Sequence, residues 1–319
     1  MSKTFSVLVH ESQYPAAVRE EFVRSLRERA VNHKFHYESY KQTAKWLELH
    51  ERYSPARTDL DCVTIYDRAF AAAAELAGPD VTLVGLGAGG GQKDASFLEI
   101  LKAGGKRTGY VPLDVSTPMV LTAALTAKAE SPVRSAPIVA DLGVAEDLAA
   151  VIDPVATGRE QIFTFFGMIP NFHPELILPR LRHLIRSGAI LLLSANLSPG
   201  TDYARGVSAI VPQYDNQLTR EWLMMFLLDL GVDYGDGELR WTIEGDRFLR
   251  ITASFHFSRE RRIRAEGESF EFHAGDRVQL FFSYRYRTEL LKKLLIEYGF
   301  EVENHWITQS GEEGVFLCH

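Results

Sequence analysis

Short continuous runs of apolar residues alternate with segments of helical periodicity through the middle of the chain. The runs are rich in Val, Ile, Leu and Phe, which is typical of strands buried on both faces of a sheet. Strands and helices that alternate at this spacing predict a parallel sheet with right-handed crossovers, whose ligand lies across the carboxyl ends of the strands. The expected strands cover residues 81–86, 108–114, 136–141, 161–166 and 189–195, and the expected helices cover residues 61–77, 94–103, 116–130 and 175–185.

The pattern changes after the fifth expected strand. Residues 217–230 keep a helical periodicity, whereas residues 248–257 (FLRITASFHF) alternate with a period of two, as antiparallel strands with one face in water do. The chain then returns to a helix at 288–298 and to strands at 300–307 and 314–318, which a Ser-Gly turn separates. Two strands joined by a tight turn predict an antiparallel hairpin at the edge of the parallel sheet.

Together these patterns predict an α/β fold with a mostly parallel sheet, a terminal antiparallel hairpin and an inserted α+β domain. We expect residues 61–196 and 286–319 to form the sheet domain. The polar, helix-prone residues 1–60 precede the first strong strand, so they are expected to join residues 197–285 in a second domain.

The composition indicates a soluble globular protein, because 46% of the 319 residues are hydrophobic and 24% are charged. A net charge of −7 argues against nucleic-acid binding, and we interpret the basic run 259–264 (RERRIR) as a solvated strand or turn. Cys62 and Cys318 are too few for a disulfide framework or a metal knuckle. Without an apolar segment suited to secretion or membrane insertion, we expect a cytoplasmic protein with no metal and no membrane partner.

The most informative stretch is residues 81–93 (VTLVGLGAGGGQK), where an apolar strand runs into five glycines within seven residues. Glycine permits positive φ and a close approach of the backbone to a ligand, so this loop is expected to bind a nucleotide. Gly85, Gly87 and Gly90 satisfy the GxGxxG pattern, which keeps an NAD(P)-dependent oxidoreductase open as an alternative. A Walker loop is excluded because Gln92 precedes the lysine and no Ser or Thr follows it.

Three features favour S-adenosylmethionine (SAM) over a dinucleotide. Asp114 ends the second strand, where it could hold ribose hydroxyls, and Asp141 ends the third, where it could bind an adenine amino group. The fourth strand opens into the loop Gly167–Asn171, and the chain ends in the hairpin. This combination is typical of the Rossmann-like sheet of class I methyltransferases.

Several segments in this order and spacing carry a family resemblance. They are residues 53–59 (YSPARTD, like YYPTRxE), 83–93 (LVGLGAGGGQK, like LVELGSGxxEK), 110–116 (YVPLDVS), 139–142 (VADL), 165–174 (FFGMIPNFHP, like FLGSTIGNFxP), 213–216 (QYDN, like AYDD) and 275–287. Over residues 34–319 the chain resembles the ergothioneine-pathway histidine α-N-methyltransferase (EgtD-like) family, with its fungal relatives that methylate prenylated tryptophan.

The resemblance implies two sets of site residues. Asn171 and Tyr214 match the family residues that hold the α-amino and carboxylate groups of the substrate, and we expect them to be catalytic. The resemblance also implies that Lys93 faces the methionine carboxylate of SAM, and a charge-assisted bond of this kind is compatible with a loop that ends beside a helix N-terminus. The full cofactor set is Tyr53, Gly87, Gly89, Lys93, Asp114, Asp141 and Leu142.

The departures from the family concern the ring of the substrate. The family holds the imidazole of histidine with a Tyr, a Glu and a Ser, and those positions are interpreted here as His36, Phe281 and Ser283. A Phe in place of the carboxylate would leave a buried imidazole N–H unpaired, at a cost of about 1 to 3 kcal/mol. A larger, more apolar side chain near Phe281, Phe282 and Met168 is expected instead.

The sequence therefore predicts a SAM-dependent N-methyltransferase that acts on the α-amine of an amino acid or a related small amine other than histidine. The alternatives are the NAD(P)-dependent oxidoreductase and a SAM-binding protein whose catalytic site has decayed. The identity of the amine stays open at this stage.

Overall fold

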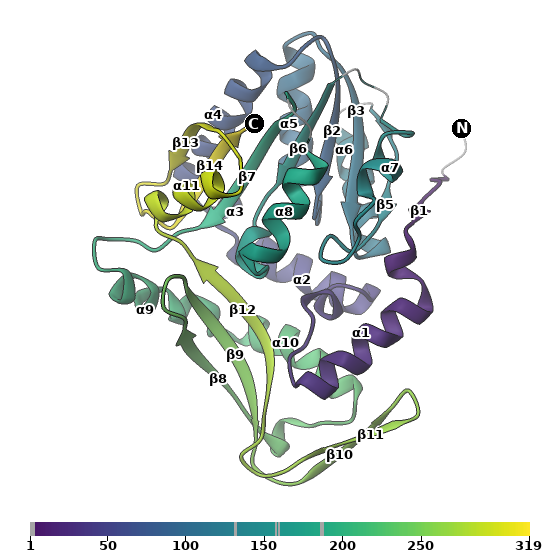
Figure 1. Cartoon of the computed structure of the whole chain (residues 1–319), viewed down its shortest axis with the longest axis vertical. Coiled ribbons are helices and arrows are strands. Elements are labelled where there is room, and N and C mark those ends of the chain that lie inside the picture. Colours follow the sequence, from purple (N-terminus) through teal and green to yellow (C-terminus); the bar gives the residue numbers. More distant parts are fainter. Residues whose placement is uncertain (1–3, 131–132, 157, 159, 186–187) are drawn as a thin grey trace.

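The computed structural model describes residues 4–130, 133–156, 158, 160–185 and 188–319. An upper α/β domain is built around a 9-stranded sheet, and a second domain lies below it (Figure 1). The strand order is β1-β5-β3-β2-β6-β7-β14-β13, with β4 beside β3. The strands are β1 (Leu8–Val9), β2 (Asp80–Leu86), β3 (Arg107–Asp114), β4 (Arg134–Ser135), β5 (Ile138–Val139), β6 (Glu160–Phe165), β7 (Ile190–Asn196), β13 (Val302–Ile307) and β14 (Glu313–Cys318).

The direction of the strands confirms the expected Rossmann-like class I methyltransferase fold. Strands β1 to β7 pair in parallel, whereas β14 is antiparallel both to β7 and to β13, which forms the terminal hairpin. The third expected strand is shorter than the apolar run 136–141 indicated, since only Ile138–Val139 pairs with β3. On its other side, β5 pairs with Leu8–Val9, so the start of the chain extends the upper sheet.

Two hydrophobic cores cover the faces of this sheet, because successive side chains of a strand point to opposite faces. Val81 and Leu83 of β2 pack with one helix layer, and Val84 and Leu86 pack with the other. The first layer holds α4 (Leu60–Leu76), α5 (Gln92–Ala103) and α6 (Thr117–Glu130), and the second holds α7 (Leu148–Ile152), α8 (Pro174–Leu184) and α11 (Thr288–Glu297).

The lower domain is formed by two segments of the chain, one before β2 and one after β7. Helices from both segments pack on an antiparallel sheet of order β12-β9-β8. Its core joins α1, η2 and α10 to that sheet and to a two-stranded hairpin, β10–β11. The elements are α1 (Pro15–Glu28), η2 (His33–His36), α2 (Tyr40–Tyr53), α3 (Pro55–Thr58), α9 (Tyr203–Tyr214), α10 (Gln217–Asp229), β8 (Gly237–Glu244), β9 (Leu249–Phe257), β10 (Arg261–Ala265), β11 (Glu268–Phe272) and β12 (Arg277–Arg285), with the short η1 (Glu11–Gln13) and η4 (Tyr234–Asp236). The short η3 (Ile169–Asn171) follows β6, and its Ile169 belongs to the core of the upper domain.

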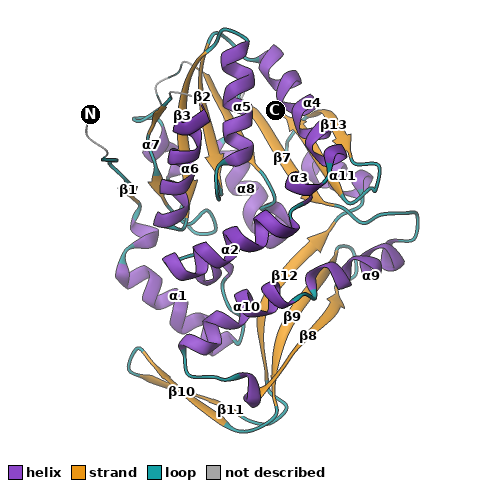
Figure 2. Ribbon diagram, turned by 180° about the vertical axis from the view of Figure 1, so that it is seen from behind, coloured by secondary structure: helices purple, strands orange, loops and turns teal. Residues whose placement is uncertain are grey.

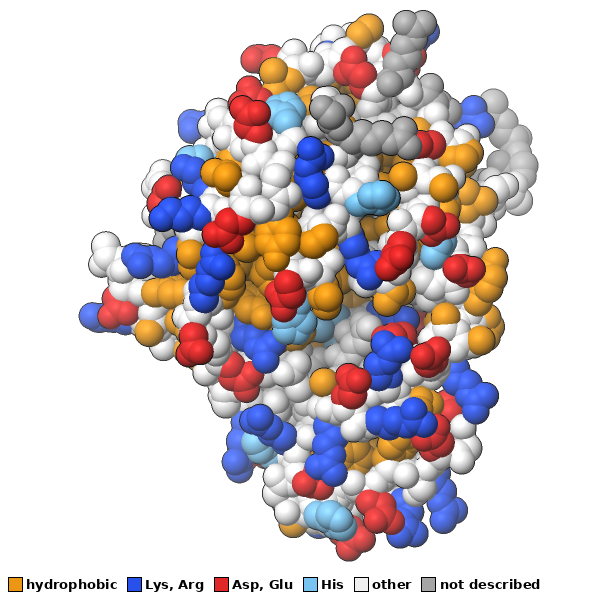
Figure 3. Space-filling model, in the orientation of Figure 1, with side chains coloured by type: hydrophobic (Ala, Val, Ile, Leu, Met, Phe, Trp, Pro, Cys, Tyr) orange, Lys and Arg blue, Asp and Glu red, His pale blue; other side chains and the backbone are white. Residues whose placement is uncertain are grey.

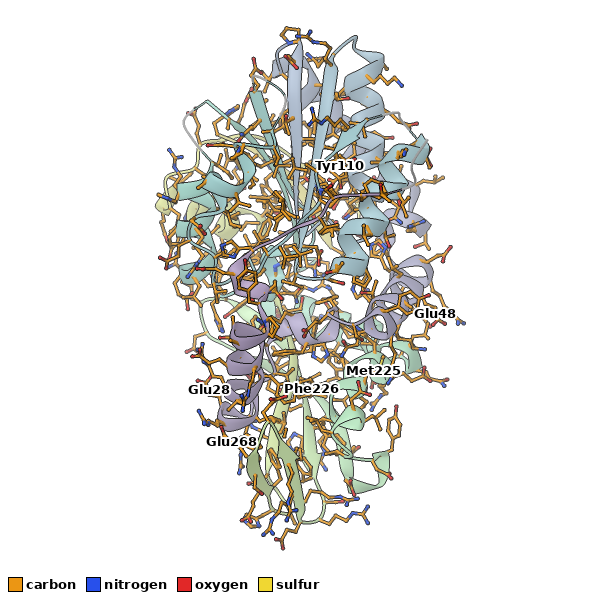
Figure 4. All side chains as sticks on the ribbon, turned by 90° about the vertical axis from the view of Figure 1, so that its right-hand side faces the viewer. Glu28, Glu48, Tyr110, Met225, Phe226 and Glu268 are labelled. Carbon is orange, nitrogen blue, oxygen red and sulfur yellow. The ribbon has the colours of Figure 1, made fainter. Side chains whose placement is uncertain are left out.

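Helix α2 crosses the junction between the two domains (Figure 2). It begins with a capping box, in which Ser39 accepts from the backbone of Gln42 and the Gln42 side chain accepts in return. Thr43 of α2 then lies 2.9 Å from the hydroxyl of Ser116, the residue before α6. Buried Tyr110 marks the interior of the upper domain and buried Phe226 that of the lower one (Figure 4).

The basic run 259–264 leads into strand β10, which fits its interpretation as a strand or turn. Arg261 belongs to β10, and Arg259 and Arg261 both form ion pairs with the buried Asp236. Over the face shown in Figure 3, Lys and Arg side chains are interspersed with Asp and Glu side chains. Within the described part of the chain, no helix combines the length and the apolar character that a membrane span requires.

Candidate active site

A cavity of about 910 Å³ lies between the carboxyl ends of the parallel strands and the lower domain. Its walls come from the glycine loop after β2, from the ends of β3 and β6, and from α2, α9 and β12. The volume lies at the upper end of the usual range for small-molecule sites. Most of the residues expected from the sequence line it: Tyr53, Gly87, Gly89, Lys93, Asp114, Asp141, Leu142, Asn171, Tyr214, Phe281 and Ser283.

The glycine loop has a backbone that other residues could not easily adopt. Gly87, Gly89 and Gly91 have φ values of 68°, 52° and 75°, which lie in the left-handed region that favours glycine. A Cβ at Gly91 would stand 2.6 Å from the Cα of Ala123 in α6. The loop is fixed at its start because the backbone N–H of Gly87 donates to Leu113 at 2.8 Å. A ligand in the cavity could therefore come close to the backbone of this loop.

Asp114 ends β3 beside this loop. Its two carboxylate oxygens accept from the backbone N–H groups of Gly89 and Ser116, each at 3.1 Å. Burial nevertheless raises the pKa of Asp114 to about 6, against the opposing effect of those hydrogen bonds. Tyr37 of the lower domain lies on the same cavity, and burial, followed by the nearby Asp114 and Tyr214, raises the pKa of its phenol.

Asp141 forms a buried ion pair across the domain junction. Lys34 Nζ in η2 lies 3.3 Å from Asp141 Oδ2, and the two side chains are only 3% and 6% exposed. The other oxygen of Asp141 accepts from the backbone N–H of Gly143 at 2.8 Å. Neither Lys34 Nζ nor Asp141 Oδ2 has a hydrogen-bond partner among the described residues. This pair thus leaves a donor and an acceptor unsatisfied on the cavity wall, beside Leu142.

Lys93 lies in the first turn of α5 and is already engaged. Its ammonium donates to the hydroxyl of Tyr66 at 2.6 Å and stands 3.7 Å from Glu313 Oε1. Tyr66 donates to the same Glu313 oxygen at 2.5 Å. Because an ammonium has three donors, the bond to Tyr66 leaves capacity for an anion in the cavity. Tyr53 lies on the same wall and is 45% exposed.

Asp94 is a buried carboxylate on the cavity wall that the sequence did not single out. It accepts from the hydroxyls of Tyr110 and Thr164, both at 2.7 Å. Burial raises its pKa to about 6, although those hydrogen bonds lower it. A Cβ at Gly85 would stand 2.1 Å from Asp94 Oδ2, so the carboxylate fills the space that the absent side chain leaves.

A hydroxyl network forms another part of the cavity wall. Tyr214, the last residue of α9, donates to Ser283 Oγ at 3.0 Å and accepts from Arg285 Nη2 at 2.8 Å. Asn196, at the end of β7, donates to Ser283 Oγ at 3.3 Å. The network joins the carboxyl end of a parallel strand to the second domain.

Asn171 also bridges the two domains. Its side-chain amide donates to the backbone carbonyl of Phe282 in β12 at 2.8 Å. Among the described residues only the nitrogen of this amide is engaged, so the side-chain oxygen is available to a ligand donor. Asn171 belongs to η3, which follows β6 directly and so reaches the cavity from the sheet.

Aromatic rings enclose the space between these groups. Phe281 lies 5.2 Å from the ring of His33, 5.7 Å from that of Tyr214 and 6.1 Å from that of Trp222, measured between ring centroids. His33 Nε2 accepts from the backbone N–H of Phe282 at 3.3 Å. Burial, with smaller contributions from the two nearest histidines, lowers the pKa of His33 to about 3, so this ring is neutral at pH 7. No acidic side chain takes part in these ring contacts.

The interpretation of His36 as a substrate residue is wrong. Its ring is fully buried, its Nε2 donates to the carbonyl of Leu280 at 2.6 Å, and it packs against Trp222 and Phe226 of α10, away from the cavity. The adjacent Tyr37 lies on the cavity wall instead, as does His33 one turn earlier. The residues of this segment that line the cavity are therefore His33, Lys34 and Tyr37 and not His36.

Comparisons with known proteins show which family and which relatives this chain resembles. The model of the family described as "Histidine-specific methyltransferase, SAM-dependent" matches residues 18–319. The N-methyltransferase imqF of Aspergillus flavus is 25% identical over 242 residues, which are 73% of this chain and 66% of that protein. The histidine N-alpha-methyltransferase of Mycobacterium tuberculosis is 25% identical over 252 residues, or 74% of each chain. A solved SAM-dependent methyltransferase from Clostridium acetobutylicum has a TM-score of 0.46 at 11% identity and covers 86% of this chain and 97% of its own.

The family match extends over both domains, from α1 to the terminal hairpin. It does not favour the NAD(P)-dependent alternative that the glycine pattern had left open. The chain belongs to the family of SAM-dependent, histidine-specific methyltransferases.

Proposed function

We propose that this protein transfers a methyl group from SAM to the α-amine of an amino acid or a related small amine other than histidine. The observation that carries the proposal is a single cavity lined by two chemically different groups of residues. We call the glycine loop and Asp114 the cofactor end, and Asn171, Tyr214, Phe281 and Ser283 the acceptor end; all of them line the cavity. Such a cavity has room for a nucleoside cofactor and a small acceptor side by side.

The residues of the cofactor end fit the parts of SAM. Asp114 is a half-buried acceptor suited to the two ribose hydroxyls, and the unsatisfied Oδ2 of Asp141 is suited to the adenine amino group. The glycines allow the backbone to approach, and Lys93 supplies a cation for the methionine carboxylate. When bound, SAM supplies a methyl group on a sulfonium, which is open to in-line displacement.

The residues of the acceptor end position the methyl acceptor. We assign Asn171 to hold the amine, because its side-chain oxygen can accept one N–H and so direct the nitrogen lone pair. Tyr214, whose hydroxyl is held by Ser283 and Arg285, binds the other polar group of the acceptor. Holding the two reactants in line supplies much of the acceleration in such a displacement, and the amine must be bound as its neutral form.

The aromatic wall supports an acceptor side chain that is larger and more apolar than imidazole. Phe281, with the neutral His33, offers no carboxylate to an imidazole N–H. An unpaired buried N–H costs about 1 to 3 kcal/mol, which disfavours histidine roughly tenfold to more than a hundredfold. Competition assays with SAM and equimolar histidine and phenylalanine, tyrosine or tryptophan should therefore yield the methylated aromatic product first. Preferential methylation of histidine would contradict the assignment.

A pH dependence of cofactor binding follows from Asp114. Its carboxyl has a pKa of about 6 in the free protein, and hydroxyl donors from the ribose bond the ionised form, so binding lowers that pKa. The affinity for S-adenosylhomocysteine should therefore be constant above pH 6 and fall below it, by up to about tenfold per pH unit. Calorimetric titrations between pH 5 and pH 8 measure this. The Asp114→Asn variant is expected to show a weaker dependence, and an equal slope in both proteins would contradict the role of Asp114.

A further inference from the structure

Arg285 places a buried positive charge on the wall of the cavity. It is the last residue of β12 and is 7% exposed. One of its nitrogens donates to the Tyr214 hydroxyl at 2.8 Å, and the other terminal nitrogen makes only long contacts of 3.4 Å and 3.5 Å to the carbonyls of Leu197 and Glu312. Its buried Nε has no partner among the described residues. This guanidinium, with five donors, is under-satisfied.

The charge of Arg285 is also unpaired. Within the described part of the chain, the ion pairs found at up to 4.0 Å do not include Arg285. Arg250, on the neighbouring strand β9, does have a partner, Glu244 Oε2 at 3.1 Å. A buried charge without a counter-ion is strongly unfavourable, and removing the partner of a buried pair costs several kcal/mol. An anion in the cavity would relieve that cost.

The position of Arg285 identifies which ligand group this anion is. Its terminal nitrogen and the Tyr214 hydroxyl lie together at the acceptor end, next to Ser283. Because Tyr214 accepts from Arg285, the phenol proton is directed away from the guanidinium, toward Ser283 or a ligand. A planar guanidinium beside a hydroxyl donor matches the shape of a carboxylate.

We propose that Arg285, together with Tyr214, binds the carboxylate of the methyl acceptor. The inference rests on the proposed function. The resemblance already implies Tyr214 at the carboxylate of the substrate, and the structure adds Arg285 there, so the decarboxylated amine should be a poor ligand. Arg285 is then a specificity-determining residue that selects acceptors with a negative charge, whereas the ring of Phe281 contacts the acceptor side chain.

The test uses pairs of ligands that differ only in the carboxylate: L-phenylalanine and phenethylamine, L-tyrosine and tyramine, and L-tryptophan and tryptamine. Their binding to the complex with S-adenosylhomocysteine is measured by calorimetry. One charge-assisted bond contributes about 1.5 to 3 kcal/mol, so the acid of the preferred pair should bind about ten- to a hundredfold more tightly than its amine. In Arg285→Met this ratio should fall to near one, through weaker binding of the acid alone.

Two controls separate this role from a structural one. Arg285→Lys keeps the charge without the planar fork and should keep part of the ratio. Arg250→Met removes a paired arginine from the adjacent strand and should leave the ratio unchanged. S-adenosylhomocysteine affinity reports whether each variant is folded. Equal loss of acid and amine binding in Arg285→Met would show that Arg285 only supports Tyr214, and would overturn the inference.

The outcomes also distinguish this inference from the proposed function. If the wild-type protein binds and methylates the amines as well as the acids, the carboxylate receptor is wrong and N-methylation stands. If S-adenosylhomocysteine binds but neither acids nor amines bind or react, both the inference and the proposed acceptor class are overturned.

Discussion

Replacing Asp114 with alanine is expected to lower the affinity for S-adenosylhomocysteine by about a hundredfold or more. The physical reason is that a carboxylate accepting from two hydroxyls contributes about 1.5 to 3 kcal/mol for each charge-assisted bond. The same side chain also fixes the glycine loop, since it accepts from the backbone N–H of Gly89. Calorimetry or equilibrium dialysis measures the change directly.

The control for this variant is Asp114→Asn. The asparagine side chain keeps an acceptor for the backbone N–H of Gly89 or Ser116, so it preserves part of the loop while removing the charge. We expect an intermediate affinity and an unchanged circular dichroism spectrum. Affinity equal to that of the wild-type protein in Asp114→Ala would place the ribose elsewhere and refute the assignment of this end of the cavity.

Replacing Phe281 with glutamate is expected to shift the acceptor preference toward histidine by about ten- to a hundredfold. The new carboxylate would stand among His33, Tyr214 and Trp222, where an imidazole N–H otherwise has no acceptor. The preference is measured as the ratio of kcat/KM for histidine to that for the best aromatic amino acid. Because a shift in this ratio compares two substrates on one protein, a general loss of stability does not produce it.

The matched variant for this prediction is Phe281→Gln. Glutamine is similar in size to glutamate and disrupts the aromatic packing to a similar extent, but it carries no charge. Because its amide oxygen can accept the imidazole N–H without a charge, we expect a substrate ratio between that of the wild-type protein and that of Phe281→Glu. An unchanged ranking in Phe281→Glu would mean that position 281 does not face the side chain of the acceptor.

The sheet could be predicted from the sequence because its strands are buried on both faces. Short continuous apolar runs such as those of β2 and β7 are typical of buried parallel strands. The hairpin at the end of the chain was predicted for a similar reason, since a Ser-Gly turn separates its two strands. The pairing of Leu8–Val9 with β5 could not be predicted, because a strand of two residues has no periodicity.

The error at His36 has a local physical cause. His33–His36 form a 3-10 helix, in which successive side chains turn by about a third of a circle. The packing of Trp222 and Phe226, far along the chain, decides which of these rings is buried and which faces the cavity. A shift of one residue therefore exchanges a core ring for a site residue, and sequence matching alone could not tell His36 from Tyr37.

The polar residues that the sequence did not single out share another property. Lys34, Asp94 and Arg285 are charged groups held at 7% exposure or less. In the sequence each has charged or polar neighbours that resemble a solvated surface, so its burial could not be predicted. Charged residues are almost never fully buried unless they are paired. Lys34 has Asp141 as its partner and Asp94 accepts from Tyr110 and Thr164, whereas Arg285 has no acidic partner among the described residues.

Methyl transfer itself tests the central claim most directly. The purified protein is incubated with SAM that carries an isotopically labelled methyl group, together with the twenty common amino acids and their decarboxylated amines. Mass spectrometry with fragmentation then locates the label. The account predicts a labelled methyl on the α-nitrogen of an amino acid other than histidine. Label on another atom, histidine as the best acceptor, or no product despite bound cofactor would contradict it, and the last of these would indicate a decayed catalytic site.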